Sequence, residues 1–351
     1  MDNMATGPKI KKETKNKIRV EFERTSFWTR FKLKYLSLHF LQTAVWVIFR
    51  LVLLVGISYV ILSPLLSKIF CSFMSKEDFV DVTVKYIAKY PTLSTYKALI
   101  TEMKYFKAVF NTACLSIFCA LVQTFICCVV GYGFAKFKFK FNKLLFFLVI
   151  FTMIVPHETV QLSMFMKFRY FDIFGIFKLL GGGVIDGFKI LPFDSINLLN
   201  TYWPLALLSI GGLAFKNGLY IFMMRQYFRG VPDELEESAY LDGSGVFRTF
   251  IQIIIPLSVP MMITIFLFAF SWQWTDMFYT NLFFTKKSIA MMPSLIERIP
   301  PSLETDYAGQ NMYYSAITNT ASLLIIAPLI IIYLFCQRYL IAGIERSGIV
   351  G

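Results

Sequence analysis

The sequence predicts an all-α, polytopic membrane protein with six transmembrane helices. Of the 351 residues, 56% are hydrophobic and only 16% are charged, and the mean hydropathy is +0.60, which lies outside the usual balance of a soluble domain. Several apolar runs approach or exceed the roughly 20 residues that a helix needs to cross a bilayer. The six spans that we expect are residues 51–70, 108–134, 144–166, 201–224, 256–280 and 315–336.

The chain before the first span is strongly basic. Residues 1–50 contain eleven Lys and Arg, among them Lys9, Lys11, Lys12, Lys15 and Lys17. In a membrane protein this favours a disordered arm against anionic lipid headgroups over the alternative, RNA binding. Residues 25–50 mix aromatic and basic side chains, which predicts an amphipathic lead-in helix at the interface or, alternatively, the beginning of a longer, tilted first helix.

The distribution of Lys and Arg predicts that both termini are cytoplasmic. In this topology the cytoplasmic segments hold 20 basic residues, whereas the outer segments, equal in total length, hold 13, and basic residues resist translocation. A short loop supports this orientation independently through Lys136, Lys138, Lys140 and Lys143. We therefore expect a cytoplasmic tail and lead-in at 1–50, a first helix and outer loop at 51–105, a transmembrane domain at 106–339 and a cytoplasmic tail at 340–351.

Nothing in the sequence predicts a catalytic, metal or cofactor site. Four of the six cysteines, Cys114, Cys119, Cys127 and Cys128, fall in one apolar run, which indicates packing residues rather than a disulfide framework. The two histidines, His39 and His157, lie in separate elements. The sequence has no nucleophile elbow and no phosphate-binding G-x-x-x-x-G-K-[ST] loop, so we expect a protein that is not an enzyme.

The connection between spans four and five predicts a helix, a turn and a helix. Pro232 suits a first helical position, the acidic residues that follow suit a helix N-terminus, and Asp242 with Gly243 supplies a stop. Phe247, Phe250 and Ile254 then share one face of a second helix, which should end near Pro256 and Pro260. The alternatives are an ordinary solvated loop and a DNA-reading helix-turn-helix, whose carboxylates would repel phosphate.

One motif in this hairpin is specific. Glu237-Ser238-Ala239 is followed after three residues by Gly243 and after nine more by Ile253-x-Ile255-Pro256, which resembles the EAA loop of ABC importer permeases. The resemblance implies a coupling hairpin, residues 225–256, that seats on a cytoplasmic ATPase. It implies a polar ATPase contact for Glu237, close packing for Ala239 and Gly243, and the turn for Asp242. Ser238 replaces the usual Ala and adds a hydroxyl that needs a partner.

The resemblance extends from about residue 106 to the end and is strongest to the carbohydrate-importer branch typified by the maltose permease pair. The segments that carry it are Asn200-Thr201-Tyr202-Trp203-Pro204, Arg225-Gln226-Tyr227-Phe228-Arg229, Ser271-Trp272-Gln273-Trp274-Thr275-Asp276 and Gly343-Ile344. It implies a type I importer permease in the plasma membrane of a prokaryote. The implied partners are a second permease, ATPase subunits that use ATP, and an extracellular sugar-binding protein. The outer stretch around 170–195 departs from the pattern because it is longer.

Polar residues inside apolar spans need a partner or a role. His157 and Glu158 form one pair, which either lines the passage or makes a polar contact within the bundle. Lys216 and Asn217 form a second pair, for which the structural interpretation is that the long stem of Lys216 reaches the cytoplasmic interface. A third group could hold a sugar between indoles and polar groups or form an interfacial belt: Trp272, Gln273, Trp274 and Asp276.

Three other functions remain as alternatives. A secondary transporter acting alone would couple to ions through residues such as Glu158 and Asp276, and predicts inverted repeats with paired broken helices, which the sequence does not reveal. A structural or assembly factor would leave the polar span residues without a role. An importer permease for amino acids or peptides would share the same hairpin motif.

Overall fold

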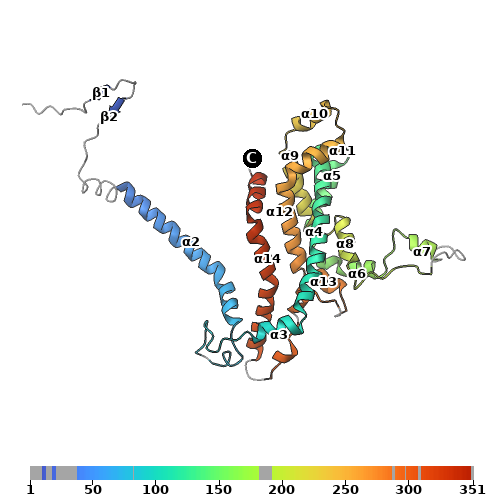
Figure 1. Ribbon diagram of the computed structural model, residues 1–351. Helices are drawn as coiled ribbons and strands as arrows, with labels where there is room; N and C mark the ends of the chain where they lie inside the picture. Colours follow the sequence, from blue (N-terminus) through green and yellow to red (C-terminus); the bar gives the residue numbers. More distant parts are fainter. Residues whose placement is uncertain are drawn as a thin grey trace, which may run out of the picture. The chain divides into compact units, whose positions relative to one another are not determined.

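The computed structural model describes residues 10–12, 18–20, 38–81, 83–181, 192–286, 289–296, 298–306 and 310–348, and side chains between residues 42 and 340. The chain divides into two compact units, residues 1–67 and 68–351 (Figure 1). In the first unit, strand β1 (Ile10–Lys12) pairs antiparallel with β2 (Ile18–Val20). Lys11 and Lys12 lie in this ladder, so the expected disorder is wrong there; Lys9, Lys15 and Lys17 lie outside the described residues.

The first long helix begins earlier than the predicted span. Helix α2 runs from Leu38 to Cys71 without interruption, and its stretch from Gln42 onward is long and apolar enough to cross a membrane. Residues 38–50 therefore belong to a longer first helix, which was the alternative to a separate lead-in at the interface. Trp46 and Phe49 stack within this stretch, with ring centroids 5.7 Å apart.

The core of the second unit is a bundle of four helices: α4 (Tyr105–Lys136), α9 (Asn217–Arg229), α12 (Ile255–Thr275) and α14 (Gln310–Gly348). Small residues on α4 allow close approach, as in many membrane bundles. A Cβ on Gly131 would lie 2.5 Å from the Met224 Cβ of α9. The described cysteines are free, and Cys119, Cys127 and Cys128 are buried whereas Cys114 is exposed, so packing accounts for three of the four in this helix.

Spans three and four are broken helices, which corrects the prediction of two continuous spans. Helix α5 (Asn142–Ile154) ends before Pro156, and the chain turns by 93° into the 3-10 turn η1 (His157–Val160) and α6 (Gln161–Arg169). Val155, which precedes the proline, is extended, as the proline ring requires. Span four consists of α8 (Trp203–Ile210) and α9, separated by residues 211–216.

The fifth span is longer at its start than predicted. Helix α11 (Val246–Thr249), the π-helical turn η2 (Phe250–Ile254) and α12 form one helix, which passes through both prolines where we expected an end. Pro256 has no N–H to bond, and the wider π-helical turn just before it accommodates that loss. Asp276 ends α12, so the remainder of the predicted span forms a separate short helix, α13 (Phe278–Phe283).

Within the described ranges, four helices are long and apolar enough to cross a membrane, or five if the bent pair α5 to α6 counts as one span. The other predicted span, the fourth, is α8 with α9, each too short alone. Further short helices lie in the connecting segments: α3 (Ser94–Glu102), α7 (Ile176–Leu180), and the 3-10 turns η3 (Pro293–Leu295) and η4 (Pro301–Leu303). Part of the long stretch at 170–195, residues 182–191, lies outside the described residues.

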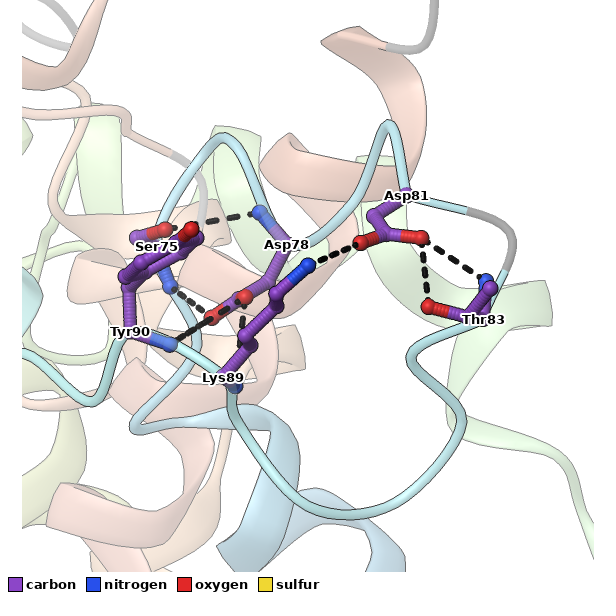
Figure 2. A network of polar contacts seen from close by, with 6 residues as sticks. All are labelled: Ser75, Asp78, Asp81, Thr83, Lys89 and Tyr90. Atoms are coloured by element: carbon purple, nitrogen blue, oxygen red, sulfur yellow. Dashed lines mark hydrogen bonds and ion pairs between the residues drawn. The ribbon is translucent and has the colours of Figure 1, made fainter.

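A buried carboxylate organises the loop between α2 and α3. The Asp78 side chain is 2% exposed and accepts backbone N–H groups of Ser75, Lys89 and Tyr90 at 3.1 to 3.3 Å (Figure 2). Asp81 lies further out, where Thr83 and then Lys89 hydrogen-bond its carboxylate and lower its pKa from 3.8 to about 2. This contact is therefore complete above pH 3.8 and is lost as the pH falls toward 2.

Replacing Asp78 should open this loop locally. In Asp78→Ala, three backbone N–H groups lose a charged acceptor, and such hydrogen bonds contribute about 1.5–3 kcal/mol each. We expect the amides of Lys89 and Tyr90 to exchange with deuterium at least about tenfold faster. Asp81→Ala is the matched control, because it removes a carboxylate that is 30% exposed and accepts neither the Lys89 nor the Tyr90 backbone N–H, so it should change those two rates less than about twofold. Equal acceleration in both variants would contradict the role of Asp78.

Candidate functional site

The coupling hairpin has the predicted helix-turn form. Its first helix, α10 (Glu234–Leu241), begins two residues after Pro232. The predicted stop is confirmed: Gly243 has φ +82°, Ser244 N–H donates to the Ala239 carbonyl at 2.9 Å, and Gly243 N–H donates to Tyr240 at 3.0 Å. This is a Schellman cap. A Cβ on Gly243 would meet no atom of this chain, so the requirement for glycine here is backbone conformation, not close packing within the chain.

The hairpin turns apolar side chains outward at its tip. Leu241 is 89% exposed and Phe247 is 75% exposed. The predicted apolar face of the second helix thus divides, since Phe250 and Ile254 are buried while Phe247 is not. Of the residues in the motif, Ala239 is buried, whereas the rest are exposed: Glu237, Ser238, Asp242 and Gly243. An apolar tip with carboxylates around it is the composition of a protein-docking surface.

An ion-pair cluster, which we call the Lys136 latch, holds the hairpin against the end of α4. The Lys136 ammonium donates to the Val231 carbonyl at 2.7 Å and pairs with Asp233 and with Glu236, the latter at 3.5 Å. Tyr132, one helical turn earlier, donates its hydroxyl to Glu236 at 3.0 Å. Glu236 is only 8% exposed, and its partners on α4 lie about a hundred positions away in sequence, so no local pattern predicts the latch.

A cavity of about 330 Å³ joins the two helix breaks. Val155, Pro156, His157 and Glu158 line it from the bend after α5, and residues 212–219 line it from the break between α8 and α9. Non-helical backbone at membrane depth is tolerated where protein buries it or where it lines a polar cavity. Both interruptions are therefore parts of one feature, which the sequence did not reveal as broken helices.

Two residues at the second break carry polar groups toward this cavity. Lys216 has φ +66°, and its ammonium lies 4.8 Å from the Phe215 ring centroid and 5.1 Å from that of Trp272. Trp272 is near the end of α12 opposite to the hairpin, so the predicted reach of Lys216 toward the hairpin side is wrong. Asn217 is 1% exposed, and neither polar atom of its side chain has a hydrogen-bond partner among the described residues.

The predicted group in span five separates into different roles. Trp272 is 47% exposed and packs on Phe215, 5.2 Å between centroids. Trp274 is buried and donates to the Ile325 carbonyl at 2.9 Å. Asp276 accepts backbone N–H groups at the start of α13, and the Gln273 amide nitrogen is buried with no hydrogen-bond partner in the described part of the chain. Of these four, Trp272 is the residue with ring contacts to the cavity, through Phe215 and Lys216.

His157 and Glu158 lie at the mouth of the cavity. The Nδ1 atom of His157 is 2.6 Å from the Tyr279 hydroxyl of α13, and its ring is 4.9 Å from Phe215. Glu158 is exposed and also lines an open groove with Met277 on the other side of η1. The break at Pro156 thus brings His157 into contact with Tyr279, in the predicted span five. His157 both makes a bundle contact and lines the cavity, the two positions that the sequence left open.

Comparison with known proteins decides the family. The model of the binding-protein-dependent transport system inner membrane component matches residues 128–346. The chain belongs to this family. It is 26% identical to the probable ABC transporter permease protein YurM of Bacillus subtilis, over 88% of this chain and 89% of that one. It is 27% identical to the maltodextrin transport system permease protein MalD of Streptococcus pneumoniae, over 84% and 92%.

A solved structure confirms the fold. The crystal structure of a bacterial ABC transporter involved in the import of the acidic polysaccharide alginate superposes with a TM-score of 0.60, covering 85% of this chain and 97% of that chain at 20% identity. The protein is therefore a multi-pass permease subunit of an ABC importer and not an enzyme, as the EAA-like motif indicated. Family membership also excludes the secondary transporter acting alone.

Proposed function

We propose that this permease translocates a carbohydrate delivered by an extracellular binding protein. Two relatives, of Streptococcus pneumoniae and Bacillus subtilis, are named as maltodextrin and galactooligosaccharide transport permeases. Two features of the cavity support the same cargo class: Asn217, whose buried amide has no hydrogen-bond partner in the described chain, lines it, and Lys216, which also lines it, lies over the Trp272 indole. Indole faces stack on the apolar face of a sugar ring, and amides hydrogen-bond its hydroxyls.

The coupling hairpin is the feature that carries the rest of the proposal. A second, related permease completes the passage, and ATPase subunits bind the exposed tip formed by Leu241 and Phe247, with Glu237 at its edge. This chain binds no cofactor, because ATP acts in the ATPase. The hairpin and both termini face the cytoplasm in this arrangement. Closure of the ATPase moves the hairpin, and the latch and α12 transmit that motion to the broken helices.

Transport by reconstituted vesicles tests the cargo. The chain is assembled with its permease, ATPase and binding-protein partners, and ATP-dependent uptake of a labelled maltodextrin is compared with uptake of labelled amino acids and peptides. We expect accumulation of the oligosaccharide alone. Accumulation of amino acids or peptides with no oligosaccharide uptake would reject the carbohydrate while retaining the importer.

Asn217→Leu should reduce oligosaccharide uptake at least about tenfold, because a buried hydrogen-bonding group that meets a cargo hydroxyl is replaced by an apolar one of similar size. ATPase association should not change, since Asn217 lies at the end of α9 away from the hairpin. Asn111→Leu serves as control: it removes an amide that donates to Ala290 outside the cavity and should leave uptake within about twofold. Normal uptake by Asn217→Leu would remove the cavity from the cargo path.

A further inference from the structure

A groove of about 670 Å³ follows the turn between α4 and α5, next to the Lys136 latch. The sequence of the turn alternates, with Phe137, Phe139 and Phe141 separated by Lys138 and Lys140. The backbone is extended at Phe137, with φ −92° and ψ 133°, and enters the left-handed region at Phe141, with φ +69°. The turn therefore presents aromatic rings and ammonium groups to the same groove, and the Lys140 ammonium lies 5.4 Å from the Phe141 ring centroid.

The aromatic rings of the turn are suited to the membrane interface. Phe137, Phe139 and Phe141 are 44%, 43% and 61% exposed. Three exposed rings side by side are unusual in a turn that faces only water. The Phe139 ring also packs on Phe134, with centroids 6.0 Å apart, and Phe134 packs on Phe146 at 5.6 Å. The turn is thus anchored to α4 and α5 while its outer rings remain available to acyl chains.

The basic groups of the groove have no carboxylate within ion-pair distance in the described residues. Four basic residues line the groove: Lys138, Lys140, Lys143 and Arg225. None of them forms an ion pair with a carboxylate in the described ranges, where Lys136 takes both nearby acids, Asp233 and Glu236. The Arg225 guanidinium lies 4.0 Å from the Phe146 ring centroid, and its Nε is buried without a hydrogen-bond partner in the described chain.

We propose that this groove binds the headgroup phosphate of an anionic phospholipid in the leaflet on the hairpin side. Phosphate oxygens supply acceptors for the unpartnered Arg225 Nε and neutralise the lysines, while the acyl chains lie against the exposed phenylalanines. Basic residues also accumulate in cytoplasmic loops simply because they resist translocation. That tendency alone would explain neither the exposed phenylalanines nor the buried, unpartnered Arg225 Nε. The site adjoins the latch, so bound lipid would stabilise the base of the coupling hairpin.

Native mass spectrometry of the complete purified transporter, titrated with phosphatidylglycerol or with phosphatidylcholine, tests the site. In Lys138→Gln/Lys140→Gln/Lys143→Gln we expect at least about tenfold weaker phosphatidylglycerol binding and unchanged phosphatidylcholine binding, because lysines near a membrane are attracted to its anionic headgroups. The three lysines are exposed, so folding should not suffer. The matched control Lys167→Gln/Arg169→Gln/Lys178→Gln removes equal charge from exposed positions on α6 and α7 and should bind like wild type.

Three results would overturn the proposal. The first is equal loss of lipid in the control variant, which would indicate general attraction. The second is displacement of phosphatidylglycerol by soluble glycerol phosphate at similar concentration, which would indicate a free-phosphate site. The third is unchanged lipid binding with loss of the ATPase from the lysine variant, which would make the groove a protein-docking surface.

Discussion

Leu241→Asp and Phe247→Asp should each remove the ATPase from the purified complex while the permease still inserts into the membrane. Both side chains project from the hairpin tip, 89% and 75% exposed, so a charge there does not disturb this chain's own core. Burial of a large apolar side chain at an interface contributes about 1.5–3 kcal/mol, and an aspartate would in addition be desolvated beside Glu237. We expect ATPase affinity to fall at least about a hundredfold, measured by co-purification and titration.

A matched control is available in the loop between α2 and α3. Ile87 is 82% exposed and lies between Asp81 and Lys89, away from the hairpin, so Ile87→Asp makes the same kind of change and should leave ATPase binding unchanged. Glu237→Ala should have a smaller effect than the tip variants, because exposed polar contacts contribute less than buried apolar ones. If the tip variants retain the ATPase, docking uses another surface and the coupling function of the hairpin fails with it.

Local signals in the sequence predicted the hairpin well. The acidic first turn, the stop at Gly243 and the motif are all contained within a few residues of one another, and capping depends only on neighbouring residues. The error at Pro256 had a different cause. A proline normally ends a helix, and the π-helical turn of residues 250–254 that lets the helix continue depends on its packing in the bundle.

The candidate cavity was only partly predictable. Pro156 marks one break, yet hydropathy cannot register a 93° turn, because it is an average along the sequence and the two helices together are apolar enough for one span. The second break depends on positive φ at Gly212 and Lys216, and a lysine gives no warning of that conformation. Sequence reasoning named His157, Lys216 and Asn217 correctly as polar residues that need explanation, but only the fold shows that they line one cavity.

The last prediction concerns the Lys136 latch. Lys136→Met removes the cation from beside Glu236, a residue that is 8% exposed. The Glu236 carboxylate is then left with two tyrosine hydroxyls as its hydrogen-bond donors. Breaking a buried ion pair from one side costs about 3–5 kcal/mol, which exceeds what the exposed Asp233 contributes. We expect the ATPase to bind but its hydrolysis to become independent of the loaded binding protein, so that sugar uptake falls at least about tenfold while ATP turnover continues.

The double variant Lys136→Met/Glu236→Gln separates the ion pair from the docking surface. With the buried carboxylate neutralised, the cost of its lost partner disappears, so the double variant should recover part of the coupling that Lys136→Met alone loses. Asp233→Asn is the control, since its carboxylate is exposed, with a pKa held below the ordinary value by the Lys136 ammonium, and its loss should leave coupling close to wild type. If Lys136→Met remains coupled, force reaches the membrane through α11 and α12 alone. If the double variant is no better than the single one, Lys136 acts through its bond to the Val231 carbonyl and not through Glu236.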